Sequence, residues 1–267
     1  MVRAGAEVRG DGVVTTAFHE NGNRPYSHLA PNYDDTVGRP FFHRTRRIFE
    51  RLISRYGITF RSAADIGCGT GLFARYLNQD WRVPVFGVDL SAAMLRIALR
   101  RCRGLNVCLL KQDIRYLRLP RRVDLITCNF DTLNHLISDG DLLSAFRHIN
   151  RNLNPNGHFI FDMVLHCQPL GDANRYVRRF RTGDRFVTQD VRWQPWRRLL
   201  SIIVSIGAPG RCSRIVERHI ERAYSVKEID DALHEAGFTI RGVHDGETLA
   251  PISTCPPRIV VVAVRRS

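Results

Sequence analysis

The sequence predicts an α/β fold in which a mostly parallel sheet carries helices on both faces, with an antiparallel β cap inserted after the fifth strand. Two patterns support this prediction. From residue 62 onward, short apolar segments alternate with helical ones, as in a parallel sheet with crossover helices. Between residues 165 and 224, strand-like alternation continues without an intervening helix. We therefore expect a flexible leader over residues 1–25, a core formed by 26–164 and 225–267, and a cap over 165–224.

The elements before the cap can be placed in chain order. Ile48, Phe49, Leu52 and Ile53 recur at helical spacing and predict one helix ahead of the sheet. Apolar runs predict five parallel strands, at residues 63–66, 83–88, 106–110, 123–128 and 158–163. Helical patterns cover residues 72–79, 92–101 and 141–153, and the run at 154–157 predicts a turn. Ser91 stands where an N-cap is expected for the second of these helices.

The cap and the last part of the core follow from the same two periodicities. Residues 186–191, 199–206 and 213–224 alternate as strands, and Ala208-Pro209-Gly210 predicts a hairpin turn. After the cap, a helical pattern covers 226–236, and strand patterns cover 238–244 and 258–264. The core sheet is therefore expected to continue on both sides of the insertion.

The chain is strongly basic, because 40 Lys and Arg against 26 Asp and Glu among 267 residues give a formal charge of +14. Only Lys111 and Lys227 are lysines, and the arginines are spread through nearly every segment. A nucleic-acid surface is more typically a concentrated stripe with interleaved aromatic residues. We expect most of this charge on solvated faces and no nucleic-acid partner, with the arginine-rich cap as the segment that could instead attract an anionic acceptor.

Two further classes of protein are disfavoured. No apolar run approaches the roughly 18 to 20 residues of a membrane span, and no signal-type segment opens the chain, so we expect a cytoplasmic protein without a membrane partner. The seven cysteines are scattered and lack the CxxC or Cys/His spacing of a metal site. No metal is expected.

The sharpest motif is DIGCGTG at residues 65–71, placed where the first strand turns into a helix. Glycines permit positive φ and a close backbone approach to a ligand, and the helix N-terminus offers free N–H groups. Asp89 follows the second strand, where a carboxylate can accept hydrogen bonds from ribose hydroxyls, and Asp113 follows the third. The spacing is not the G-x-G-x-x-G of dinucleotide sites. The sequence therefore predicts a nucleotide-like ligand at this edge of the sheet.

With these residues the chain resembles the class I S-adenosylmethionine-dependent methyltransferases over roughly residues 30–265. The resemblance rests on DIGCGTG at 65–71, GVDLSAAML at 87–95, KQDIRYL at 111–117, FDTLNHL at 130–136, LNPNG at 153–157, FIFDM at 159–163 and RAYSVKEIDDALHEAGF at 222–238. It is greatest with small-molecule members that carry an antiparallel lid, some of which N-methylate amino sugars or amino acids. It implies a Rossmann-like seven-stranded sheet with an antiparallel last strand, S-adenosyl-L-methionine as cofactor and S-adenosyl-L-homocysteine as product.

The resemblance also implies which residues contact the cofactor. Gly67, Cys68 and Gly69 would line its methionine part, with Asp65 near its ammonium group. The other implied contacts are Asp89 for the ribose, Leu90 and Met94 for the adenine face, Asp113 and Ile114 for the adenine edge, and Asn129 and Phe130 beside the sulfonium.

Methyl transfer from a sulfonium depends mainly on alignment and desolvation, so a base is needed only if the acceptor must lose a proton. His135 is the leading candidate base because it lies on the acceptor-facing loop, although a packing histidine is an equal alternative. Tyr33 falls where relatives have a tyrosine that closes over the donor, with core packing as the alternative. On the cap, alternation puts Glu217, His219 and Glu221 on one face. We expect Glu217 and His219 to meet the acceptor or water, and Glu221 to face water.

The function predicted from these residues is transfer of a methyl group to a nitrogen or oxygen of a small molecule by in-line displacement, in a monomer or homodimer. Residues 129–132 read NFDT and lack the NPPY-type sequence of enzymes that methylate base amines or glutamine amides. Two alternatives remain open. One is an RNA methyltransferase that uses Arg175–Arg198 with Trp193 and Trp196 as stacking surfaces, and the other is a noncatalytic protein that binds the donor but has lost its acceptor site.

Overall fold

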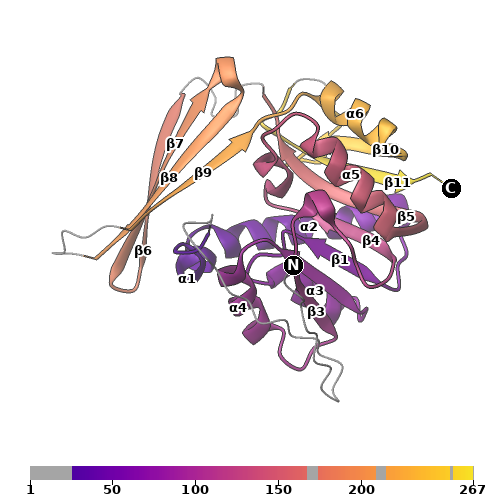
Figure 1. The fold of residues 1–267 in the computed structure, drawn as a ribbon, viewed down its shortest axis with the longest axis horizontal. Coiled ribbons are helices and arrows are strands. Elements are labelled where there is room, and N and C mark those ends of the chain that lie inside the picture. Colours follow the sequence, from indigo (N-terminus) through magenta and orange to yellow (C-terminus); the bar gives the residue numbers. More distant parts are fainter. Residues whose placement is uncertain (1–25, 167–173, 209–214, 253–254, 267) are drawn as a thin grey trace, which may run out of the picture.

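The computed structural model describes residues 26–166, 174–208, 215–252 and 255–266. Its core is a seven-stranded sheet of order β10-β11-β5-β4-β1-β2-β3, and a second sheet of order β6-β7-β8-β9 projects from it (Figure 1). The pairs formed among β1 to β5 are parallel, while β11 runs antiparallel to both β5 and β10. The predicted fold class is thereby confirmed, including the antiparallel last strand.

The core strands lie close to their predicted ranges. They are β1 Ala63–Ile66, β2 Val85–Asp89, β3 Val107–Lys111, β4 Val123–Cys128, β5 Leu153–Val164, β10 Phe238–Asp245 and β11 Arg258–Arg265. The run at 154–157, predicted as a turn, instead forms the start of β5, with Asn156 at a φ of 59°. The apolar runs therefore located the strands, and the error was confined to one strand's beginning.

Helices cover both faces of the core sheet. Side chains of α2 Arg39–Tyr56, α3 Leu72–Asp80 and α4 Ala92–Arg101 pack on one face, and those of α5 Asp141–Asn152 and α6 Val226–Glu235 pack on the other. The helix predicted ahead of the sheet is α2, preceded by the short α1 Ala30–Tyr33 and a π-helical turn at Asp34–Gly38. Ser91 caps α4 as predicted, since its hydroxyl accepts a hydrogen bond from the Met94 N–H at 3.4 Å.

The cap sheet has four antiparallel strands where the sequence predicted three. They are β6 Arg175–Thr182, β7 Arg185–Gln194, β8 Leu199–Gly207 and β9 Ile215–Arg222. The unpredicted strand β6 reads RYVRRFRT, so arginines on both faces conceal its alternation, and it lies at the sheet edge. The leader expected over residues 1–25 lies outside the described residues, as does most of the turn expected at 208–210. The proposed division into core and cap stays a prediction.

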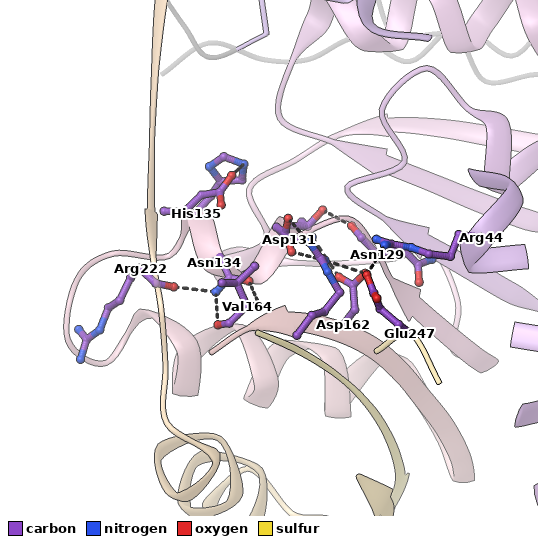
Figure 2. A network of polar contacts seen from close by, with 12 residues as sticks. Arg44, Asn129, Asp131, Asn134, His135, Asp162, Val164, Arg222 and Glu247 are labelled. Carbon is purple, nitrogen blue, oxygen red and sulfur yellow. Dashed lines mark hydrogen bonds and ion pairs between the residues drawn. The ribbon is translucent and has the colours of Figure 1, made fainter. Parts of the chain in front are cut away.

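The chain leaves the core sheet for the cap and returns from it at one place. Leu165 and Tyr224 form an isolated parallel bridge. Asn134, on the loop after β4, donates to the carbonyls of Val164 at 3.0 Å and Arg222 at 2.7 Å and accepts from the Val164 N–H at 3.0 Å (Figure 2). One fully buried amide therefore fixes the end of β5, the end of β9 and the loop that carries His135.

Candidate active site

The turn between β1 and α3 is built by its glycines. The N–H groups of Gly67 and Cys68 both donate to the Val88 carbonyl, at 2.7 and 2.9 Å. Gly67, Gly69 and Gly71 have φ values of 69°, 53° and 80°, a region that side chains disfavour. At Gly67 an added Cβ would also collide with the side chain of Thr132. The turn therefore needs glycine both for its conformation and for its close packing against the loop after β4.

Asp89 is held against this turn by backbone donors. One carboxylate oxygen accepts from the Gly69 N–H at 2.8 Å, and the other accepts from the Ser91 N–H at 2.8 Å. Hydrogen bonds to an ionised carboxylate are among the stronger ones in proteins. The end of β2 and the glycine turn are thus locked together, which places a carboxylate at a defined position beside the turn.

A cavity of about 560 Å³ opens beside the glycine turn, and we call it the glycine-turn pocket. Most of the residues implied as cofactor contacts line it, together with both candidate catalytic residues. These are Gly67, Gly69, Asp89, Leu90, Met94, Asp113, Ile114, Phe130, Tyr33 and His135. The glycine-turn pocket is therefore lined by side chains from the ends of three strands and from the segment before α2.

Three of the implied contacts lie behind the wall of this pocket. Asp65 is buried and accepts a hydrogen bond from the Thr127 hydroxyl at 2.9 Å, and burial raises its pKa to about 7. The Cys68 side chain packs in the core with side chains of α3 and α4. Asn129 is buried, and its Nδ2 has no hydrogen-bond partner among the described residues. The Cys68 side chain therefore points away from the pocket that it was expected to line.

Asp113 already has a partner in the chain. Its carboxylate accepts from the Arg115 guanidinium at 2.6 and 3.0 Å and from the Arg115 backbone N–H at 2.9 Å. These hydrogen bonds lower the pKa of Asp113, so it stays ionised at neutral pH. Arg115 also reaches Asp141 at 3.2 Å. An adenine amino group at this edge would share the Asp113 carboxylate with that guanidinium.

A second cavity, of about 310 Å³, lies between the core and the cap sheet, and we call it the cap cavity. Tyr26, Tyr33 and Phe130 line both this cavity and the glycine-turn pocket. Strand β9 also borders both, because alternate residues along it face the two hollows. The two cavities are therefore neighbours that share one aromatic wall.

His135 and Tyr26 meet at this wall. The Tyr26 hydroxyl lies 3.0 Å from His135 Nε2, and burial lowers the pKa of His135, which keeps the ring neutral near pH 7. His135 lines the glycine-turn pocket but not the cap cavity, whereas Tyr26 lines both. Burial raises the pKa of Tyr26 and of Tyr33, so both hydroxyls stay protonated. Sequence reasoning did not single out Tyr26, because its partner His135 is 109 residues away.

The aromatic wall is supported by a buried ionic cluster. Phe130 and Asp131 both have left-handed backbone conformations, with φ of 61° and 59°, which cost about 1–2 kcal/mol each in non-glycine residues. Arg258 pairs with both carboxylate oxygens of Asp131, one of them at 2.7 Å, and reaches Asp162 at 3.2 Å. Figure 2 shows Asp131 and Asp162 side by side in this network. The guanidinium therefore holds the turn that presents Phe130 to both cavities.

The three polar residues of β9 are buried on one face, as the alternation predicted. The expectation that Glu221 faces water is wrong, because this side chain lines the cap cavity. His219 lines the cavity as well. Glu217 does not, since its carboxylate accepts a hydrogen bond from the Leu29 N–H at 2.6 Å. The N-terminal segment that covers β9 at this point could not be foreseen from the strand's own pattern.

The surface expected of an RNA-binding cap is not formed as predicted. Trp193 is 7% exposed and packs inside the cap, and only Trp196, at 82%, is exposed for stacking. Arg175 and Arg192 both pair with Asp190, at 2.8 and 3.0 Å. Among the described residues, no helix is both long and apolar enough to cross a membrane, and no three candidate ligands gather as a metal site.

Comparisons with known proteins fit this geometry. Residues 63–157 match a methyltransferase domain. Over 116 residues the chain is 33% identical to a dTDP-3-amino-3,6-dideoxy-alpha-D-glucopyranose N,N-dimethyltransferase of Streptomyces fradiae, a match that spans 43% of this chain and less than half, 44%, of that relative. The structure of an S-adenosylmethionine-dependent methyltransferase from Clostridium acetobutylicum superposes with a TM-score of 0.76 at 25% identity, covering 91% of this chain and 100% of that one. Residues 63–157 are thus a methyltransferase domain, and the chain as a whole shares the fold of an S-adenosylmethionine-dependent methyltransferase.

The fold of this methyltransferase is also shared by more distant members. The sugar N-methyltransferase KedS8 from Streptoalloteichus superposes with a TM-score of 0.73 at 19% identity, covering 98% of this chain and 100% of that one. The family's cofactor is S-adenosyl-L-methionine, with S-adenosyl-L-homocysteine as its product. The residues of the glycine-turn pocket fit this group, because a carboxylate, a glycine-bounded turn and an apolar face converge there.

Proposed function

We propose that this methyltransferase transfers a methyl group from S-adenosylmethionine to a small molecule held in the cap cavity. The supporting observation is the wall that the two cavities share. A cofactor in the glycine-turn pocket and an acceptor in the cap cavity would meet at Tyr26, Tyr33 and Phe130. These side chains are only partly exposed, which limits water at the meeting point and favours a displacement between aligned partners.

When bound, S-adenosylmethionine would supply a methyl group on a positively charged sulfur. A bond from the methyl carbon to the acceptor atom would form while the carbon–sulfur bond breaks, and the electron pair of the broken bond would stay on sulfur. The residues of this chain align the acceptor and move its proton. Tyr26 borders both cavities and lies 3.0 Å from His135 Nε2. We assign Tyr26 as the relay that takes the acceptor proton while passing its own to the neutral His135 ring.

We further propose that the acceptor atom is a nitrogen. Acidic and basic side chains both line the cap cavity, with Asp131, Glu221 and Glu247 on one side of the count and Arg44, Arg178 and Arg258 on the other. Arg258 pairs with Asp131 and Arg44 pairs with Glu247, whereas Glu221 has no lysine or arginine within ion-pair distance among the described residues. An amine that arrives as a cation would supply the missing partner of the Glu221 carboxylate, and an alcohol would not. The name of the Streptomyces fradiae relative, an N,N-dimethyltransferase, is in line with this proposal.

Replacing Asp89 tests the cofactor site. We expect Asp89→Ala to weaken binding of S-adenosylhomocysteine at least about 100-fold, because the ribose hydroxyls would lose hydrogen bonds to an ionised group, worth about 1.5–3 kcal/mol each. Isothermal titration calorimetry measures this change. Asp80→Ala, at the exposed end of α3, is the matched control and should leave the affinity unchanged. Affinity within threefold of wild type for Asp89→Ala would contradict the assignment.

The transfer itself is tested with radiolabelled S-adenosylmethionine and pairs of acceptors that share a carbon skeleton and differ only in carrying an amine or an alcohol. We expect label in the amine products and little in the alcohols. Preferential labelling of the alcohols would overturn the nitrogen assignment while leaving methyl transfer intact. Turnover of any acceptor would also exclude the noncatalytic alternative. Labelling of RNA, steeply suppressed by salt, would instead favour the nucleic-acid alternative.

A further inference from the structure

Strand β9 carries three buried polar side chains that differ in what they bind. The Glu217 carboxylate accepts from the Leu29 N–H at 2.6 Å and lies 3.5 Å from the Ser27 hydroxyl. His219 is 3% exposed, and neither of its ring nitrogens has a hydrogen-bond partner among the described residues. Glu221 approaches His135 Nε2 at 3.8 Å, which is too long for a hydrogen bond. Glu217 thus serves the fold, while the other two are left incompletely bonded.

An unpartnered buried imidazole costs folding free energy that an apolar ring of similar shape would not. His219 and Glu221 both line the cap cavity, so a ligand in that cavity can reach them. Burial lowers the pKa of His219 to about 4, so the ring is neutral at pH 7 and offers one N–H donor and one acceptor nitrogen. The unprotonated nitrogen of His219 and the carboxylate of Glu221 can therefore both accept hydrogen bonds from an amino group.

The rest of the cap wall has a different character. Val191, Leu200, Ile202 and Val204 project from β7 and β8 into the same cavity and form an apolar surface beside His219. Cross-strand pairing puts His219 opposite Ile202 and Glu221 opposite Leu200. The polar pair therefore stands at one border of an apolar strip, which fits a ligand with one polar end and an apolar body.

The charged groups around Glu221 indicate which polar group the ligand should carry. From the core, Asp131 and Asp162 face Glu221, and Arg258 lies between them. His135, on the loop after β4, and Tyr26, in the N-terminal segment, face Glu221 as well. The neighbouring group on its own strand is His219, and Tyr176 approaches from β6. Burial raises the pKa of Glu221, and a cation bound beside it would restore the ionised form.

We propose that His219 and Glu221 determine acceptor specificity by binding the amino group of an acceptor whose apolar body lies on Val191, Leu200, Ile202 and Val204. The proposal rests on the proposed methyl transfer, because it names the part of the acceptor that the cap selects. His219 and Glu221 hold the amino group beside Tyr26, and the apolar strip excludes bodies rich in hydroxyl groups.

A stability comparison tests whether His219 is held open for a ligand. His219→Phe keeps a ring against Tyr26 and should raise the melting temperature of the free protein by about 2–4 °C, because an unpaired polar group is removed. Glu217→Gln, on the same face of the same strand, should lower it, because a carboxylate bound to a backbone N–H is lost. Both variants should bind S-adenosylhomocysteine like wild type. Destabilisation of His219→Phe as large as that of Glu217→Gln would overturn the proposal.

A pair of matched probes tests the chemistry of the ligand. Cyclohexylamine and cyclohexanol share an apolar ring and differ in the polar group, and NMR signals of the His219 ring, assigned with His219→Phe, report their binding. We expect cyclohexylamine to shift these signals with at least tenfold higher affinity than cyclohexanol, and Glu221→Gln to remove that preference. Equal binding of the two probes, or no shift with either, would overturn the proposal. Binding of S-adenosylhomocysteine, measured separately by calorimetry, shows whether the proposed function has failed instead.

Discussion

The glycine-turn pocket and the cap cavity share a wall, but their polar side chains differ in how many hydrogen bonds the protein itself supplies. In the glycine-turn pocket, Asp89 receives two backbone N–H groups and Asp113 is paired with Arg115. In the cap cavity, His219 finds no hydrogen-bond partner within the described part of the chain, and Glu221 reaches only to 3.8 Å from His135. The first site is preorganised by the protein itself, whereas the second depends on what enters it. Specificity for the acceptor is therefore expected to reside in the groups that the fold leaves unsatisfied.

The largest effect is expected at the ionic cluster between the two cavities. Arg258→Gln should lower the free energy of unfolding by about 3–5 kcal/mol, because it leaves Asp162, which is buried, and Asp131, which is 17% exposed, without their guanidinium partner. Urea denaturation measures the loss. Arg175→Gln breaks an exposed pair with Asp190 and should cost no more than about 1 kcal/mol. Equal losses for the two variants would show that the wall does not depend on this cluster.

The next largest effect is expected in how the free energy of unfolding depends on pH. The pKa of His219 is about 4 in the folded protein against about 6.5 when unfolded, so the unfolded chain binds more protons between these values. Stability is therefore full above pH 6.5 and falls as the pH drops toward 4, by roughly 3 kcal/mol from this residue. His219→Phe should remove that part of the decline in urea titrations. His43→Gln, exposed on α2, should keep the wild-type slope, and the same slope in His219→Phe would refute the prediction.

The smallest effect separates two glycines of the same turn. Gly67 and Gly69 both have positive φ, but only at Gly67 would an added Cβ meet Thr132. Gly69→Ala should cost about 1–2 kcal/mol from backbone strain alone. Gly67→Ala should cost that much and also weaken S-adenosylhomocysteine binding about tenfold, since the loop carrying Thr132 must move. If calorimetry gave the same affinity for both variants, contact with that loop would not shape the pocket.

Local chemistry explains what the sequence predicted well. The core strands, the N-cap at Ser91 and the glycine turn depend on neighbours in the chain or on a fixed strand-to-helix geometry, so their patterns are visible in the residues themselves. The spacing from the turn to Asp89 likewise reflects one βαβ unit. The lining of the glycine-turn pocket was therefore largely predictable, apart from the inward direction of the Cys68 side chain.

The features that were not predicted depend on contacts between distant segments. Tyr26 acquires its place only when the N-terminal segment packs under the cap beside His135. The pairing of Arg258 with Asp131 joins residues 127 positions apart. Burial of Glu221 follows from the same packing, because alternation shows which residues share a face but not what covers that face. The acceptor side of the site is therefore a tertiary property.

The bridge between Leu165 and Tyr224 joins the two points at which the chain leaves the core sheet and returns to it. Because the departing and returning chains are already side by side, a different insertion could be grafted between these two positions without changing the order of the core strands. Asn134 would remain to hold the end of β5 in such a chimera, while its bond to Arg222 would have to be rebuilt by the graft. Evolution or engineering could thus exchange the cap while inheriting the glycine-turn pocket intact.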